Sequence, residues 1–180
     1  LPYIKKAFVG SGIRYDLFDR SNYFETLCRY HVSGRLKVAP EHSSPKVLKQ
    51  MRKMSFDSFV DLKKRFDKIN DKYALNQQLI PYFISSHPAC EMKDMVHLAS
   101  QTAALGYRLQ QVQDFTPTPM TIATETYYTG VDIYTKEKVF TEKNPAAKKM
   151  QNRIFFWYKP ENKNWARGIF KKYGMQFPRH

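Results

Sequence analysis

Residues 79–88 form a short apolar run that ends abruptly on two serines, a histidine and a proline. Apolar runs of this length, rich in aromatic and β-branched residues, are typical of strands buried in a parallel sheet. Similar runs stand at residues 4–11, 35–39 and 111–115, and helical patterns separate all four. The order β-α-β-α-β-α-β predicts an α/β fold with helices outside a parallel sheet. Four strands are too few to close a barrel, so the pattern fits part of a (β/α) barrel or an open sheet.

Helices are predicted where apolar residues recur at helical spacing between these runs. Ser44 followed by proline gives a strong helix start, and Ser55 is expected to cap the next helix. Another helix is predicted from about residue 92 to 105. Near the C-terminus, helices are predicted at about 145–158 and 164–173.

The composition suits one ordinary domain with an extension, because the chain has 180 residues and a 42% hydrophobic fraction. No apolar stretch approaches the roughly 20 residues that a membrane helix needs, and nothing in residues 1–3 leads us to expect export. The two cysteines, Cys28 and Cys90, have no metal-binding spacing. We therefore expect a reduced, cytoplasmic protein with no metal site of its own and no membrane partner. The lack of an initiator methionine before Leu1 suggests a piece of a larger protein.

Positive charge is concentrated near the C-terminus. The formal net charge is +14, of which +9 falls from Lys136 onward. Such a tail suggests a polyanionic partner, with RNA the obvious candidate. Alternatively, the basic tail faces an acidic domain of a longer chain or is simply solvated. The sequence leaves these three hypotheses open.

Five sequence blocks together resemble the YgiQ-type radical SAM proteins, in that family's order and spacing. They are FVGSGIRYDL at 8–17, LKVAPEH at 36–42, YFISSHP at 82–88, VQDFTPTPM at 112–120 and TETYYTG at 124–130. The resemblance covers residues 1 to about 130, and the basic tail matches less clearly. It implies a radical S-adenosylmethionine (SAM) enzyme of unspecified substrate, in which a 4Fe–4S cluster cleaves SAM to start radical chemistry.

The resemblance also implies a six-stranded partial (β/α) barrel. This chain would hold its last four strands within residues 1–118, and residues 119–180 would be a basic, mainly helical C-terminal extension. The family's CxxxCxxC loop, which holds the cluster on three thiolates, is absent from this chain. We therefore expect SAM and the 4Fe–4S cluster to be cofactors of the parent protein, with its N-terminal half as partner. Alone, this chain is expected to bind neither and to be inactive.

In (β/α) barrels the active site lies at the carboxyl ends of the strands, where the family blocks also fall. By the resemblance, Ser11, Arg14 and Asp16 bind SAM after the first strand. Arg14 suits a bidentate clamp on the SAM carboxylate, or it forms a structural ion pair with Asp16. Glu41 follows the second strand, over the SAM amino group or the substrate, unless it serves only the N-terminus of the following helix. The sequence identifies no catalytic residue.

Ser85 and Ser86 follow the third strand, where related barrels contact the SAM ribose and adenine. Small polar side chains suit the close approach of a nucleoside. Gln113 and Asp114 follow the fourth strand and either face the substrate cavity or cap the loop.

Two neighbours of Ser86 have other expectations. His87 is more readily a structural histidine bonded to the backbone. At Ala89 the family typically has glycine, so a positive φ would strain the turn.

The alternative function is a non-catalytic module that binds RNA through its basic C-terminal tail. The aromatic and basic residues at 155–159 would then be stacking platforms for single-stranded RNA. The same cluster would otherwise pack against a neighbouring domain.

Overall fold

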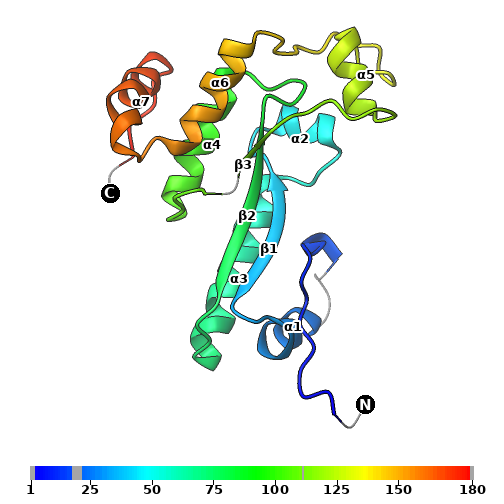
Figure 1. The fold of residues 1–180 in the computed structure, drawn as a ribbon, viewed down its shortest axis with the longest axis vertical. Coiled ribbons are helices and arrows are strands. Elements are labelled where there is room, and N and C mark those ends of the chain that lie inside the picture. Colours follow the sequence, from blue (N-terminus) through cyan, green and yellow to red (C-terminus); the bar gives the residue numbers. More distant parts are fainter. Residues whose placement is uncertain (1–2, 18–21, 111, 179–180) are drawn as a thin grey trace. The chain divides into compact units, whose positions relative to one another are not determined.

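The computed structural model describes residues 3–17, 22–110 and 112–178 (Figure 1). Its sheet has the strand order β1–β2–β3, formed by Arg35–Glu41, Gln78–Ser85 and Val112–Asp114. β2 and β3 run parallel, with Ser85 opposite Asp114. The α-helices of the described residues are α1 (Tyr23–His31), α2 (Pro45–Met51), α3 (Phe56–Tyr73), α4 (Met92–Ala104), α5 (Ile122–Thr129), α6 (Pro145–Arg153) and α7 (Pro160–Lys172). The predicted α/β class with a parallel sheet is confirmed, and the partial barrel stays a prediction.

The chain divides into two compact units. The first unit consists of the residues up to Pro40 together with Met54–Tyr82. The second consists of Glu41–Lys53 together with the residues from Phe83 onward. The second unit therefore contains the loops that follow β1 and β2, all of β3, and helices α2 and α4–α7. The domain boundary expected near residue 118 stays a prediction.

The first unit is organised by the packing of α1 against α3. The apolar side chains of Phe24, Leu27, Phe59 and Phe66 recur at helical spacing and are at most 2% exposed. Ser55 is the N-cap residue of α3, as predicted, although its side chain makes no capping hydrogen bond. The apolar residues that recur at helical spacing in the sequence are therefore the ones that form this core.

The strand predicted at residues 4–11 does not form. In the described residues of this segment the backbone is irregular, and the ladder contact is one parallel bridge between Ile13 and Val38 of β1. The Ile13 N–H donates to the carbonyl of Lys37 at 3.2 Å. Ile4 and Phe8 are 55% and 51% exposed. Within residues 4–11 the Val9 N–H donates to the His31 carbonyl at 2.9 Å, but His31 belongs to the helix α1 and not to a neighbouring strand. A strand needs ladder partners, and among the described residues this segment pairs with no strand.

The core of the second unit lies between β2, α4 and the C-terminal helices. Phe83 on β2 and Phe155 are fully buried, with ring centroids 6.5 Å apart. The 3₁₀ turn Ile154–Phe156 packs against α4, whose Met95 and Leu98 are buried. In the described part of the chain no helix is long and apolar enough to cross a membrane.

The C-terminal helices differ in their bounds from the prediction. The helix expected at 145–158 ends at Arg153 and continues as the 3₁₀ turn. Asn144 caps α6 by accepting from the backbone N–H groups of Ala146 and Ala147. The last helix, α7, begins at Pro160, four residues earlier than expected, because proline suits the first helical position.

Candidate functional site

A cavity of about 460 Å³ lies in the second unit at the carboxyl ends of the strands. The three strands contribute Glu41, Ile84 and Gln113 to its wall, with the residues that directly follow β3. The rest of the wall comes from the C-terminal end of α2 and the N-terminal end of α5. The other lining residues are Gln50, Met51, Arg52, Lys53, His87, Asp114, Phe115, Thr116, Thr118, Thr121, Ile122 and Ala123. This is the position in which open α/β sheets bind their ligands.

Glu41 has an unusual backbone conformation in this wall. It ends β1 in the left-handed region, at φ +66°, which non-glycine residues rarely adopt. Its Oε1 lies 3.4 Å from Nζ of Lys53, and its Oε2 is buried without a hydrogen-bond partner among the described residues. Burial raises the pKa of Glu41, and the nearby Lys53 opposes that rise. The carboxylate therefore offers an unused acceptor at the cavity, and such strain typically marks functional sites.

Asp114 is held in place from two sides. The Ser85 hydroxyl donates to Oδ1 of Asp114, and Nδ2 of Asn152 on α6 donates to the same oxygen at 2.9 Å. Both Asp114 and the neighbouring Gln113 line the cavity. The sequence left open whether this pair faces a cavity or caps the loop. In the structure both residues line the cavity, and their contact with a substrate stays a prediction.

Ser85 and Ser86 lie behind the wall instead of lining it. Both are fully buried, and Ser85 is used to orient Asp114. The backbone N–H and the hydroxyl of Ser86 donate to Oε1 of Gln151 at 3.1 and 3.2 Å. In this structure the two serines therefore shape the loop after β2, and their contact with a nucleoside stays a prediction.

His42 and Cys90 are buried behind the cavity wall together with Ser86 and Gln151. We call these four residues the polar layer. Nδ1 of His42 accepts from the backbone N–H groups of Ser43 and Ser44 at 2.9 and 3.0 Å. A neutral imidazole that accepts at Nδ1 carries its proton on Nε2. Nε2 of His42 lies 3.4 Å from Sγ of Cys90, so the imidazole donates to the sulfur. Burial lowers the pKa of His42 to about 3, which keeps the ring neutral.

Gln151 joins this layer to the loop after β2. Sγ of Cys90 lies 3.5 Å from its Oε1, and its Nε2 donates to the Cys90 carbonyl at 3.4 Å. Burial raises the pKa of the Cys90 thiol, which favours the protonated form that donates to Gln151. Sequence reasoning assigned no role to Gln151, Cys90 or His42 in such a network.

His87 has both a backbone bond and a place in the cavity wall. Its Nδ1 lies 3.0 Å from the Pro88 carbonyl, which can only accept, so Nδ1 carries the proton. In the neutral ring Nε2 is then an acceptor, and burial lowers the His87 pKa. The ring stands edge-on to Phe115, with centroids 5.0 Å apart. The structural role expected for His87 is present, and the lining position is what sequence reasoning missed.

The cavity carries both signs of charge. Arg52 and Lys53 follow α2, and Arg52 adopts the left-handed conformation that ends this helix. Its guanidinium lies 4.2 Å from the ring centre of Tyr134. With Glu41 and Asp114 on the same wall, the site suits a ligand that bears an amino group and a carboxylate. Sequence reasoning assigned no role to Arg52.

The remaining predicted residues belong to the first unit. Nε of Arg14 donates to Oδ1 of Asp16 at 2.9 Å, and Nη2 of Arg14 donates to Oδ2 of the same carboxylate. This bidentate ion pair is the structural alternative weighed from the sequence. The Arg14 side chain is 75% exposed and Ser11 is also exposed. The cavity of the second unit therefore gathers Glu41 and the Gln113–Asp114 pair but not these three residues.

The donor set of this chain does not fit a 4Fe–4S cluster. Such a cluster needs three thiolates in one place, and the two cysteines are buried in different units. Burial raises the pKa of the Cys28 thiol to about 12. Among the described residues no group of three or more His, Cys, Asp or Glu side chains is arranged to hold a metal ion.

The second unit is thus an α/β unit with a mixed-charge cavity at the carboxyl ends of its strands. A family model described as a domain of unknown function (DUF3362) matches residues 110–176. That match begins at β3 and includes α5–α7.

The whole chain is similar to UPF0313 proteins, the YgiQ-type family. It is 51% identical to one from Bacteroides thetaiotaomicron, over 98% of this chain and 30% of the relative. It is 50% identical to one from Porphyromonas gingivalis, over 96% and 29%, and 43% identical to one from Methanocella arvoryzae, over 90% and 27%. The chain thus spans under a third of the length of these curated relatives. They agree with the YgiQ-type resemblance, and their names state no activity.

Proposed function

We propose that this chain is part of a radical SAM enzyme, in which the second unit orients SAM and walls the substrate cavity. The proposal rests on the backbone conformation and the buried carboxylate of Glu41. Glu41 is a strained residue at the carboxyl end of a parallel strand, with a buried carboxylate oxygen that has no partner among the described residues. A buried acceptor without a donor is costly unless a ligand supplies that donor. The motif resemblance suggests SAM as the ligand, and the UPF0313 relatives support only the view that this chain is part of a longer YgiQ-type protein.

The residues of the cavity fit the chemical groups of SAM. Glu41 would accept a hydrogen bond from the SAM amino group or from a ribose hydroxyl. Arg52 or Lys53 would pair with the carboxylate of SAM. Gln113 and Asp114 would face the substrate. When bound, SAM supplies the radical chemistry, while the protein supplies position and electrostatics.

Residues outside this chain would have to hold the cluster, since the cysteines here do not fit it. The N-terminal part of the same protein is the proposed partner. Tyr3, Ile4 and Phe8 are exposed apolar residues in the first unit, and an edge of β1 is bridged only at Ile13 within the described residues. A preceding strand of the same protein would pair with this edge and cover these side chains.

The test measures SAM binding by the anaerobically reconstituted full-length gene product, with formation of 5′-deoxyadenosine as the second readout. Glu41→Gln should weaken SAM binding about tenfold or more, because it removes a charged acceptor from a buried hydrogen bond. Glu125→Gln is the matched control, since Glu125 is exposed on α5 and does not line the cavity. Unchanged affinity in Glu41→Gln would refute the assignment of Glu41, and a reconstituted protein that binds no SAM would refute the function.

A further inference from the structure

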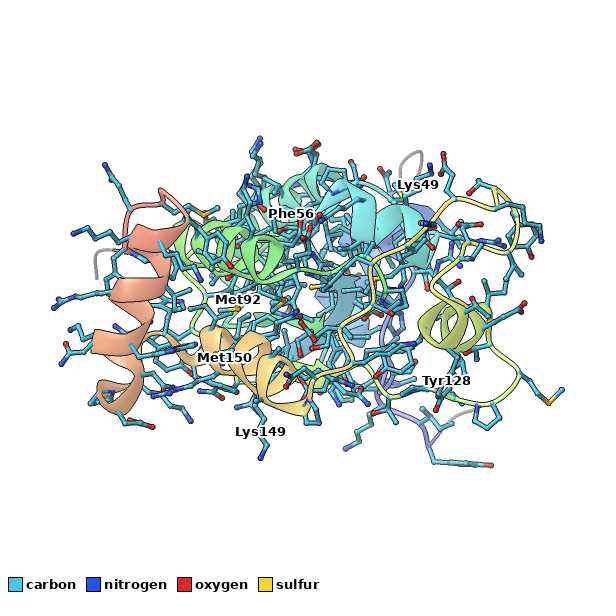
Figure 2. All side chains as sticks on the ribbon, turned by 90° about the horizontal axis from the view of Figure 1, so that it is seen from above. Lys49, Phe56, Met92, Tyr128, Lys149 and Met150 are labelled. Carbon is cyan, nitrogen blue, oxygen red and sulfur yellow. The ribbon has the colours of Figure 1, made fainter. Side chains whose placement is uncertain are left out.

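A series of cations runs along α7 at one-turn spacing. Lys159, at the N-cap position, is followed by Lys163, Arg167 and Lys171, each four residues after the last. Residues four apart lie on the same helix face, about 6 Å apart along the axis. Arg167 and Lys171 are exposed, and the other two are partly exposed. We call these four residues the α7 basic face, and nitrogen-tipped side chains spread outward from this helix in Figure 2.

This arrangement is unfavourable for an isolated helix. Like charges at i and i+4 destabilise a helix by about 0.2–0.5 kcal/mol per pair, and Lys159 lies at the positive end of the helix dipole. The acidic residue of α7 is Glu161 alone. No ion pair involves the α7 basic face in the part of the chain that the structure describes. Of the four cations only Lys171, in the last turn, is favoured by the helix dipole, so the series as a whole is better explained by an anionic partner.

Aromatic rings lie beside these cations. The Lys159 ammonium is 4.5 Å from the ring centre of Phe156, and the Arg167 guanidinium is 5.3 Å from that of Phe177. Arg153 on α6 likewise lies 4.5 Å from Trp165. All three rings are partly exposed. Cations interleaved with accessible rings are the pattern that binds nucleic acid, through phosphate contacts and base stacking.

We propose that the α7 basic face binds the phosphate backbone of a nucleic acid. The regular spacing of single charges suits a repeating polyanion better than it suits an irregular acidic protein surface, and the rings add the second element of single-strand binding. The inference goes beyond SAM chemistry, because the α7 basic face does not line the cavity at the strand ends.

The test is fluorescence anisotropy of a labelled single-stranded RNA with the full-length gene product, between about 50 and 200 mM salt. The variant carries Lys163→Gln, Arg167→Gln and Lys171→Gln together. Each phosphate contact on a single strand contributes about 0.7 to the slope of log affinity against log salt, so the slope should fall by about 2. Affinity should fall about tenfold or more at the lower salt.

The matched control carries Lys64→Gln, Lys68→Gln and Lys72→Gln on α3. These residues have the same four-residue spacing, and the substitutions remove the same charge. The control should keep the slope, and circular dichroism should show both variants folded. An unchanged slope in the α7 variant, or an equal loss in the α3 control, would overturn the proposal. Equal binding of polyglutamate would also overturn it, in favour of an acidic protein partner.

Discussion

The two units of this chain bury their interiors in different ways. The first unit buries aromatic side chains such as Phe24 and Phe59 between its helices. The second also buries aromatic residues but adds a polar layer behind its cavity, with His42, Ser86 and Gln151 each at most 1% exposed. Buried polar groups are tolerated only when they are hydrogen-bonded, and these are. We infer from this difference that the second unit contains the functional site, and that its buried polar groups lower the stability of that core.

The charged surfaces of α3 and α7 repeat this contrast. On α3, Lys63 pairs with Asp67 at 2.6 Å and Lys64 with Asp61 at 3.3 Å. On α7 the cations have rings beside them instead of carboxylates. The lysine series of α3 at positions 64, 68 and 72 is thus largely neutralised, because Lys72 also pairs with Glu25 at 3.1 Å. The α7 basic face has no such carboxylates among the described residues, so an anionic ligand explains it better.

The sharpest test of the polar layer is Gln151→Leu. It would leave the buried N–H of Ser86 without its acceptor and remove the partner of the Cys90 thiol, so it should cost about 2–3 kcal/mol of unfolding free energy. In the first unit, Gln77 similarly donates to the carbonyls of Cys28 and Val32, at 2.7 and 3.2 Å. Because Gln77 is only partly buried, water can replace it, and Gln77→Leu should cost about 1 kcal/mol.

Urea unfolding measures both variants, and hydrogen exchange at the Ser86 amide reports the loop directly. That amide should exchange faster in Gln151→Leu and stay unchanged in Gln77→Leu. If both substitutions lowered the unfolding free energy equally, the hydrogen bonds of Gln151 would contribute no more to stability than those of the partly buried Gln77.

His42 should give the second unit a stability that depends on pH. Its folded-state pKa is about 3, below the ordinary value of 6.5, so the unfolded chain takes up the proton first. The contribution is complete above about pH 6.5 and is lost as pH falls toward 3, at about 1.4 kcal/mol per pH unit. His42→Asn keeps an acceptor near Nδ1 but cannot titrate. Between pH 7 and 5 the wild type should therefore lose about 2 kcal/mol more than the variant.

Urea midpoints at the two pH values measure that difference, and the comparison with His42→Asn removes the contribution of His87. The control His31→Asn changes a partly exposed histidine on α1 of the first unit and leaves His42 in place, so the loss of stability that depends on His42 should remain. A wild type and a His42→Asn variant with the same pH dependence would show that His42 is protonated equally in the folded and unfolded states.

Much of this architecture follows from local sequence patterns, and the rest depends on contacts between distant residues. Apolar runs located β1, β2 and β3, and the rule for strand ends selected Glu41 and the Gln113–Asp114 pair. The same pattern failed at residues 4–11, because an apolar run does not reveal whether a neighbour covers it. Gln151 was missed since it meets Ser86 across 65 positions of the chain, and a lone glutamine on a helix carries no signal of such a bond.

The smallest expected effect concerns backbone strain, which both units share. Ala89, at a position where the family typically has glycine, has φ +70° in the loop after β2, and Ala74 has φ +49° at the end of α3. An L-residue in this region costs about 1–2 kcal/mol, and glycine gives back part of that gain through its greater freedom when unfolded. Ala89→Gly and Ala74→Gly should each raise the unfolding free energy by about 0.5–1 kcal/mol in urea titrations. If Ala89→Gly alone were destabilising, the Ala89 methyl group would have to make contacts worth more than the strain, and the two units would then differ in their backbones as well as in their side chains.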